Sequence, residues 1–179
     1  MNRKNGFIVV YTGKGKGKTT AALGLSLRAI GHGAKVFMVQ FKKAESDKSG
    51  EIESIRKYLS SCFRVFQTGR KGAVASGEDI PEEEYSLTWD GFVKGKEALF
   101  SGEYELVIWD EINVVMDLGL LPVEKVVEAL KERPPHVDIV LTGRSAPAEI
   151  IEIADLVSEV EDVKHPFHKG VKARTGMEF

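Results

Sequence analysis

The sequence has a single cysteine and no long hydrophobic run, and both scarcities exclude classes of protein. One cysteine among 179 residues cannot form an internal disulfide, so the chain is not a disulfide-stapled secreted scaffold. No apolar stretch approaches the ~20 residues that a membrane-spanning helix requires. The short apolar run near the N-terminus has no small-residue cleavage site after it, so we expect no signal peptide and a cytoplasmic location.

The chain also lacks a strong excess of charge of either sign. Its 25 Lys and Arg residues nearly balance 27 Asp and Glu residues, which leaves a formal net charge of −2. Nucleic acids and anionic membranes are usually bound through a basic excess, so neither partner is expected. A composition of 42% hydrophobic and 29% charged residues is typical of a globular protein, and we expect one domain over residues 1–179.

Short apolar runs alternate with longer segments of helical periodicity. We expect strands at 7–11, 35–41, 63–67, 104–111, 137–144 and 156–162. We expect helices at 18–31, 51–61, 122–133 and 146–154, and a further helix from Tyr85 onward. Strands that alternate with helices indicate a parallel sheet covered by helices on both faces.

Three other segments have distinct compositions. Residues 68–84 are rich in Gly, Ser and acids and form the longest expected loop, which we interpret as mobile, either as a lid or without a further role. The helix after it carries a stripe at 3.6-residue spacing that we expect to face the core: Tyr85, Trp89, Phe92, Val93, Lys96, Leu99 and Phe100. Residues 163–179 form a basic, irregular C-terminal segment whose cations we expect to be solvated: Lys164, His165, His168, Lys169, Lys172 and Arg174.

The motif TGKGKGKTT, at residues 12–20, lies between the first expected strand and the first helix. Glycines there let backbone N–H groups turn inward and bind phosphate at a helix N-terminus. In a phosphate-binding loop of this kind, Lys18 reaches the phosphates and the Thr19 hydroxyl binds Mg²⁺, although Thr12 stands where the general pattern begins with Gly. The motif predicts a nucleoside-triphosphate site in an α/β protein with an open, mostly parallel sheet and helices on both faces, the P-loop NTPase (RecA-like) architecture.

Two consecutive acids, Asp110 and Glu111, end the strand expected at 104–111. In open parallel sheets ligands bind beyond the carboxyl ends of the strands, which is where a Mg²⁺ ligand is needed. Arg144 ends another strand and either faces an anion or lies on the surface. The loop and the acids favour a magnesium–nucleotide site, but they do not choose between a kinase, an ATPase, a GTPase and other reactions.

Four stretches together resemble the ATP:corrinoid adenosyltransferase family of cobalamin biosynthesis and salvage. They are TGKGKGKTTAALGLSLRAIGHGAKVFMVQF, VIWDE, ALKERPPHVDIVLTGR and VKHPFHKGVKARTGMEF, and they follow the order of the family over almost the whole chain. The threonine at position 12 is itself a trait of that family. This combination is far more specific than a phosphate-binding loop alone.

The resemblance implies a transferase that moves the 5′-deoxyadenosyl group of ATP to the cobalt of a Co(I) corrinoid and releases triphosphate. The cobalt attacks the ribose C5′ rather than phosphorus, and the triphosphate lies reversed relative to other P-loop enzymes. Mg²⁺ with ATP as co-substrate, a reduced corrinoid as the second substrate, a reductant protein and a homodimer are further implications of the resemblance.

The positions that match the family give the expected site residues. Lys18, Thr19 and Glu111 are the expected catalytic residues. Thr19 and Glu111 would bind Mg²⁺ directly, and Asp110 would contact these ligands rather than the metal itself. ATP binding is expected from Gly13, Lys14, Gly15, Lys16, Gly17, Lys18, Thr19 and Thr20. Arg28 and Gln40 also match the family, without an assigned role.

Two positions depart from the family pattern. Lys14 replaces an Asn and adds a cation to the loop. Many relatives have T-G-F-x-W where this chain has TGRKG, so Arg70 stands at the position of the Phe and no Trp follows. In relatives those aromatics shield the lower face of the corrinoid. Phe66, or Tyr85 and Trp89, are candidates to replace them.

Two other functions stay open from the sequence. A kinase or an ATPase would use the same loop for attack at phosphorus, and would release phosphate or ADP without a corrinoid. A module that binds ATP or a corrinoid without turnover would be consistent with the missing aromatic pair.

Overall fold

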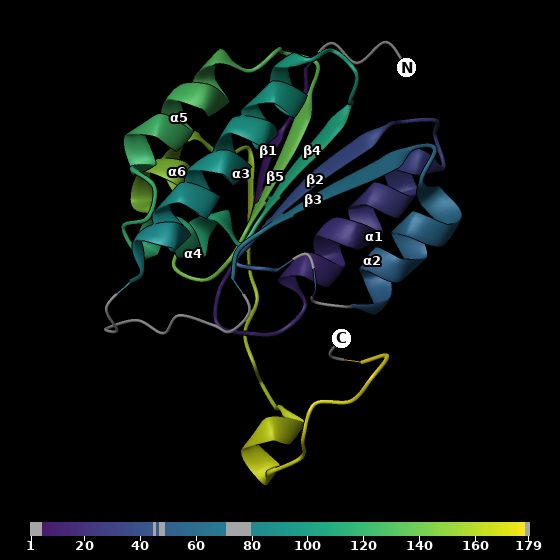
Figure 1. Cartoon of the computed structure of the whole chain (residues 1–179), viewed down its shortest axis with the longest axis vertical. Coiled ribbons are helices and arrows are strands. Elements are labelled where there is room, and N and C mark those ends of the chain that lie inside the picture. Colours follow the sequence, from purple (N-terminus) through teal and green to yellow (C-terminus); the bar gives the residue numbers. More distant parts are fainter. Residues whose placement is uncertain (1–4, 45, 47–48, 71–79, 178–179) are drawn as a thin grey trace.

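The computed structural model describes residues 5–44, 46, 49–70 and 80–177, and in these ranges six strands form one sheet. The strand order is β3-β2-β4-β5-β1-β6, and all neighbouring strands are parallel (Figure 1). The strands are β1 (Ile8–Thr12), β2 (Val36–Phe41), β3 (Phe63–Thr68), β4 (Leu106–Asp110), β5 (Asp138–Thr142) and β6 (Leu156–Glu159). The expected open, parallel α/β sheet is confirmed.

Helices cover both faces of this sheet. They are α1 (Lys18–Ile30), α2 (Gly50–Ser54) with a π-helical turn η1 (Ile55–Leu59), α3 (Glu82–Phe100), α4 (Ile112–Asp117), α5 (Val123–Glu132) and α6 (Ala148–Ile153). A 3₁₀ turn, η2 (Pro166–Lys169), lies away from the sheet in the C-terminal segment (Figure 1). Helices α1 and α2 lie on one face and α3 to α6 on the other (Figure 1). Along the described part of the chain, no helix has the length and apolar character that a bilayer span requires.

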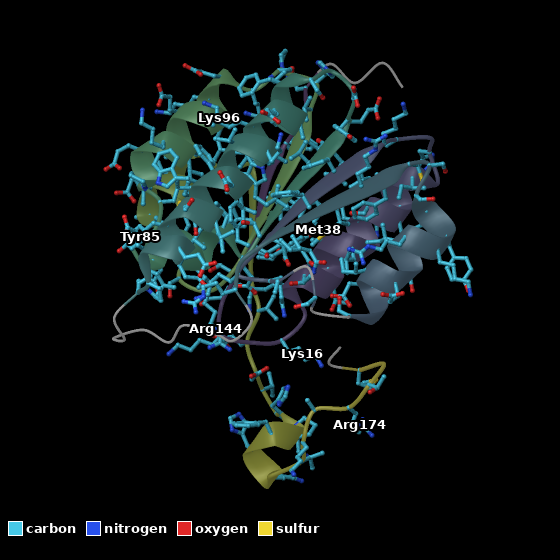
Figure 2. The ribbon with its side chains drawn as sticks, in the orientation of Figure 1. Lys16, Met38, Tyr85, Lys96, Arg144 and Arg174 are labelled. Carbon is cyan, nitrogen blue, oxygen red and sulfur yellow. The ribbon has the colours of Figure 1, made fainter. Side chains whose placement is uncertain are left out.

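Each face of the sheet has its own apolar core, because successive strand residues point to opposite faces. In β4, Val107 and Trp109 belong to the core shared with α3 to α6, whereas Leu106 and Ile108 belong to the core shared with α1. In Figure 2, Met38 of β2 lies between the sheet and α1. Burial on both faces explains why the sequence of β4 is a continuous apolar run rather than an alternating one.

Helix α3 differs from the expectation in its start and in the face it buries. It begins at Glu82 rather than Tyr85, and the expected loop at 68–84 is shortened because Thr68 belongs to β3. Residues 71–79 of that loop lie outside the described residues.

The expectation that the whole aromatic stripe of α3 faces the core is wrong in part. Phe92 and Leu99 are buried, but four other members are 39–48% exposed: Tyr85, Trp89, Val93 and Phe100. Figure 2 shows Tyr85 and Lys96 on the outer surface of the molecule. The physical reason is that small residues of α3, Gly91 and Gly95 among them, face the sheet and rotate the helix away from its aromatic side.

The close approach of α3 to the sheet predicts opposite effects for two helical glycines. A Cβ at Gly95 would overlap the indole of the fully buried Trp109, whereas a Cβ at Gly24 of α1 meets nothing within 4 Å. We expect Gly95→Ala to lower the free energy of unfolding by about 1–3 kcal/mol through overpacking. Gly24→Ala should raise it by about 0.5–1 kcal/mol through helix propensity. Urea denaturation measures the free energy of unfolding of both variants. A Gly95→Ala protein as stable as the wild type would contradict this packing of α3 on Trp109.

Candidate functional site

The loop between β1 and α1 wraps around the ammonium group of Lys18. The Lys18 Nζ donates hydrogen bonds to the carbonyls of Gly13 (2.8 Å) and Gly15 (2.6 Å). The side chain is buried, and this burial lowers the pKa of Lys18. The loop thus holds a cation at its centre, where it can meet an anionic ligand.

The segment that follows β6 explains two of the loop glycines. Gly15 N–H donates to the carbonyl of Val160 (2.7 Å), and Val160 N–H donates to that of Thr12 (2.9 Å). A Cβ at Gly15 would lie 2.6 Å from the backbone carbon of Glu161, and one at Gly13 would overlap the Val160 carbonyl. These glycines are therefore required by backbone packing.

The N-terminus of α1 is open to an anion. Gly17 caps it with a left-handed φ of 118°, and the first turn carries no acidic residue. Free N–H groups and the helix dipole attract negative charge at such an end. Thr19 and Thr20 of this turn line the same pocket as the loop.

Asp110, the last residue of β4, is a buried carboxylate with three side-chain donors. Its Oδ1 accepts hydrogen bonds from the hydroxyls of Thr19 (2.8 Å) and Thr142 (2.6 Å). Its Oδ2 accepts one from Gln40 Nε2 (3.2 Å), and Gln67 Nε2 donates in turn to Gln40 Oε1 (3.2 Å). Burial raises the pKa of Asp110, and the three hydrogen bonds oppose this shift.

Glu111 follows at once and points in a different direction because its backbone is left-handed. Its φ is 63°, it caps α4, and its N–H donates to Thr142 Oγ1 (3.0 Å). Burial and the neighbouring charge of Asp110 raise the pKa of Glu111, whereas the cations Lys18, Lys43 and Arg144 lower it. The strand expected at 104–111 thus ends at Asp110, and Glu111 caps helix α4, which the sequence did not predict.

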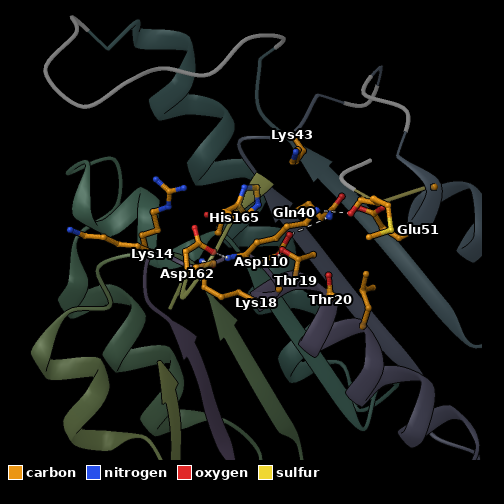
Figure 3. Close-up of a pocket in the computed structure, with 18 of the residues that line it drawn as sticks. Lys14, Lys18, Thr19, Thr20, Gln40, Lys43, Glu51, Asp110, Asp162 and His165 are labelled. Carbon is orange, nitrogen blue, oxygen red and sulfur yellow. Dashed lines mark hydrogen bonds between the residues drawn. The ribbon is translucent and has the colours of Figure 1, made fainter. Parts of the chain in front are cut away.

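These groups line a pocket of about 920 Å³ at the carboxyl end of the sheet. Figure 3 shows Asp110, Thr19 and Gln40 near its centre, with Lys14 and Glu51 toward its two sides. The start of α2 and the C-terminal segment complete the wall. The pocket therefore joins chain segments that are far apart in sequence.

Most of the expected site residues come together in this pocket. Its lining includes Lys14, Gly15, Lys16, Gly17, Lys18, Thr19, Thr20, Asp110 and Glu111, with Arg144 and Gln40. Gly13 contributes the carbonyl that binds Lys18. Arg28 is exposed in the last turn of α1 and is not part of this lining.

The basic C-terminal segment is largely exposed, as expected, but its His165 and His168 also line the pocket. Sequence reasoning also missed Thr142, Lys43 and Phe167. Thr142 directly precedes the Gly-Arg pair at the end of β5, and the neighbouring Arg144 was the one signal at that strand end. Lys43 lies in no motif, whereas Phe167 lies in the family-matching stretch VKHPFHKGVKARTGMEF, which assigned it no role.

The side-chain oxygens of Thr19, Asp110 and Glu111 form a donor set that would fit Mg²⁺. The described residues contain no cluster of three or more His, Cys, Asp or Glu suited to a metal ion. They do place the Thr19 hydroxyl on the Asp110 carboxylate, and Glu111 lines the same pocket; the pKa values of both acids are raised. Oxygen ligands from one or two carboxylates, completed by substrate phosphates and water, are typical of Mg²⁺.

Comparisons with known proteins point to one family. The family model described as ATP:corrinoid adenosyltransferase BtuR/CobO/CobP matches residues 4–179. A corrinoid adenosyltransferase from Sinorhizobium sp is 39% identical over 177 residues, which cover 98% of this chain and 81% of the relative. That of Escherichia coli (strain K12) is 38% identical over 176 residues, or 98% of this chain and 87% of the relative.

Solved structures of distant proteins share the fold. The flagellar accessory protein FlaH from Methanocaldococcus jannaschii superposes with a TM-score of 0.60 at 15% identity, over 88% of this chain and 72% of that one. A KaiC-like protein, PH0186, from Pyrococcus horikoshii OT3 gives a TM-score of 0.55 at 17% identity, over 90% and 75% of the two chains. At such identities the likeness concerns the fold alone.

The double role of the Thr142 hydroxyl leads to a prediction about stability. Thr142→Val removes the donor to Asp110 and the acceptor for Glu111 N–H while keeping the size of the side chain. We expect it to lower the free energy of unfolding by about 1–3 kcal/mol, because a buried carboxylate and a backbone donor lose partners. Thr142→Ser keeps both bonds and should cost less than half as much. Chemical denaturation checks this, and equal losses in the two variants would contradict it.

Proposed function

The chain belongs to the ATP:corrinoid adenosyltransferase family and transfers the adenosyl group of ATP to a corrinoid, and we propose that the pocket at the carboxyl end of its sheet performs this reaction. The observation that carries the proposal is the convergence of Lys18, Thr19, Asp110 and Glu111 in one pocket. The family establishes the reaction, and the geometry supports an assignment of residues to its parts.

We assign the triphosphate to the loop and the start of α1. Backbone N–H groups at the start of α1 and the Lys18 ammonium would bind its oxygens, and Lys14 and Lys16 would add positive charge at the pocket rim. On ATP binding the Lys18 Nζ would exchange its two carbonyl partners for phosphate oxygens. A lysine that already lies inside the loop loses little conformational freedom in this exchange.

We assign Mg²⁺ to Thr19 and Glu111, with Asp110 acting through the Thr19 hydroxyl. Thr19 donates its proton to Asp110, so an oxygen lone pair of Thr19 remains available as a ligand. The raised pKa of Glu111 fits a carboxylate whose compensating cation arrives with the substrate. When bound, Mg²⁺ supplies positive charge that stabilises the triphosphate as a leaving group.

The proposed step balances without a general base. The cobalt lone pair of a Co(I) corrinoid forms a Co–C bond with the ribose C5′, and the C5′–O bond breaks. The bonding electrons leave with the triphosphate, and no proton is removed from either substrate. The residues of the chain therefore have two tasks, which are to stabilise developing negative charge on the triphosphate and to hold C5′ in line between cobalt and oxygen.

Two other features of the activity rest on the family resemblance alone. A reductant that keeps cobalt as Co(I), and the pairing of two chains into a homodimer, remain predictions. A kinase or ATPase is the competing function for the same loop, and the nature of the phosphate product separates it from adenosyl transfer.

Removal of the loop lysine should abolish the grip on triphosphate. We expect Lys18→Ala to raise the dissociation constant for ATP about 100-fold, because charge-assisted hydrogen bonds to phosphate are lost. Lys94→Ala is the matched control, since Lys94 is exposed on α3 and pairs with Glu97. Isothermal titration with MgATP measures both variants. Unchanged ATP affinity in Lys18→Ala would show that the loop does not hold the triphosphate.

The assignment of Mg²⁺ predicts a variant that added metal rescues. Glu111→Ala should raise the Mg²⁺ concentration needed for half-maximal activity about 10-fold or more, because one carboxylate ligand is lost. Glu53→Ala, which changes a carboxylate of α2 outside the described pocket lining, should leave this concentration unchanged. A Mg²⁺ titration at fixed ATP measures both. If Glu111→Ala has normal activity at limiting Mg²⁺, Glu111 is not a metal ligand.

A further inference from the structure

One wall of the pocket is formed by the C-terminal segment, whose described part is residues 163–177. In Figure 1 this segment leaves β6 at the carboxyl end of the sheet, extends away from the body and returns toward α1. His165, Phe167, His168 and Met177 of this segment line the same pocket as Lys18 and Glu111. The segment is therefore a part of the site rather than a separate tail.

This segment is anchored at both ends on a single loop residue. Asp162, just before it, accepts a hydrogen bond from Lys16 N–H through its Oδ1 (3.1 Å). The Met177 carbonyl near its other end accepts one from Lys16 Nζ (2.6 Å). Figure 2 shows Lys16 on the side of the body that faces the segment. A ligand held by the phosphate-binding loop would thus lie beside both anchors.

The middle of the segment presents an aromatic cluster with its geometry already fixed. The Phe167 and His168 rings lie 6.3 Å apart, as do those of His165 and His168, with both pairs in edge-to-face geometry. The Phe167 N–H donates to His165 Nδ1 (3.1 Å), which in the neutral ring places the proton on Nε2. The cluster therefore offers an aromatic face together with an imidazole donor.

Phe167 is nevertheless 73% exposed and Met177 63% exposed. Large apolar side chains that line a pocket and stay this exposed have unburied surface available to a ligand. Stacking on an aromatic face and contact with a thioether both suit a broad, planar, polarisable ring.

The other aromatic candidates lie elsewhere. Phe66 packs against the core on the α3 side of the sheet, and Tyr85 and Trp89 are on α3. Arg70, at the position of the family's Phe, forms an ion pair with Glu83 (3.1 Å). None of these four residues belongs to the described lining of the pocket, whereas Phe167 does.

We propose that Phe167, supported by Met177 and the two histidines, is the surface on which the corrin ring of the second substrate packs, facing the triphosphate across the pocket. The ring has a flat conjugated face and a rim of amide side chains. Phe167 and Met177 would contact the face, and the His165 Nε2–H would donate to a rim carbonyl. This inference rests on the proposed function, since it names the residues that bind the second substrate of that reaction.

The test compares Phe167→Ala with Phe167→Trp and with Phe7→Ala. Phe7 is 58% exposed beside the amino end of β1, so it controls for the loss of an exposed phenylalanine. The full-length protein is assayed anaerobically with MgATP and cob(I)alamin, and the KM of each substrate is measured separately. Binding of cob(II)alamin is measured in parallel from the change in its absorption spectrum.

We expect Phe167→Ala to raise the KM for cob(I)alamin and the dissociation constant of cob(II)alamin about 10-fold, the size of effect typical of a lost aromatic stack. The KM for ATP should stay within about 2-fold, and Phe7→Ala should resemble the wild type. Phe167→Trp keeps an aromatic face and should raise the corrinoid constants less than Phe167→Ala does. Unchanged corrinoid constants in Phe167→Ala, or an increase in the ATP constant instead, would overturn the inference while leaving adenosyl transfer intact. A wild-type protein that forms no adenosylcobalamin would overturn the proposed function, and this inference with it.

Discussion

The buried carboxylate of Asp110 is the group on which the organisation of the site depends. A carboxylate removed from water costs several kcal/mol unless it is well compensated, and the donors that compensate Asp110 come from three different elements. Thr19 from α1, Thr142 from β5 and Gln40 from β2 all donate to it, and Gln67 from β3 supports Gln40. The same bonds that stabilise the acid thus fix the phosphate-binding helix against the sheet.

The hydroxyl of Thr142 extends this constraint to Glu111. It donates to Asp110 and accepts the Glu111 N–H, which helps to hold Glu111 in a left-handed conformation that costs about 1–2 kcal/mol for a residue other than glycine. As a result, two consecutive acids have different surroundings, one bound by protein donors and one facing the pocket. Cations on the protein face Glu111 but do not remove the upward shift of its pKa. In the proposed assignment, the Mg²⁺ ion itself would supply the positive charge beside Glu111.

Sequence patterns were sufficient for the sheet, the loop and the two acids, because each depends on local residues. A buried strand followed by a glycine-rich loop and a helix is readable from β1 and α1, and the matching stretches identified the family. The orientation of α3 was not readable, because Gly91 and Gly95 determine it through contacts with Phe41 and Trp109 on distant strands. The roles of Thr142 and Phe167 were not readable either, since they arise only where β5 lies beside β4 and where the C-terminal segment meets the pocket.

The chemistry of the site follows from the identity of the electrophilic atom, C5′ or phosphorus. A loop that holds triphosphate suits both kinds of reaction. The pocket contains the groups that either reaction needs, so the pocket by itself does not distinguish them. The measurement that separates them is an anaerobic incubation with MgATP and cob(I)alamin, followed by analysis of the phosphorus-containing product and of the corrinoid spectrum. Attack at C5′ predicts adenosylcobalamin and intact triphosphate in equal amounts. ADP or orthophosphate, with the corrinoid unchanged, would contradict the assignment of this pocket to adenosyl transfer.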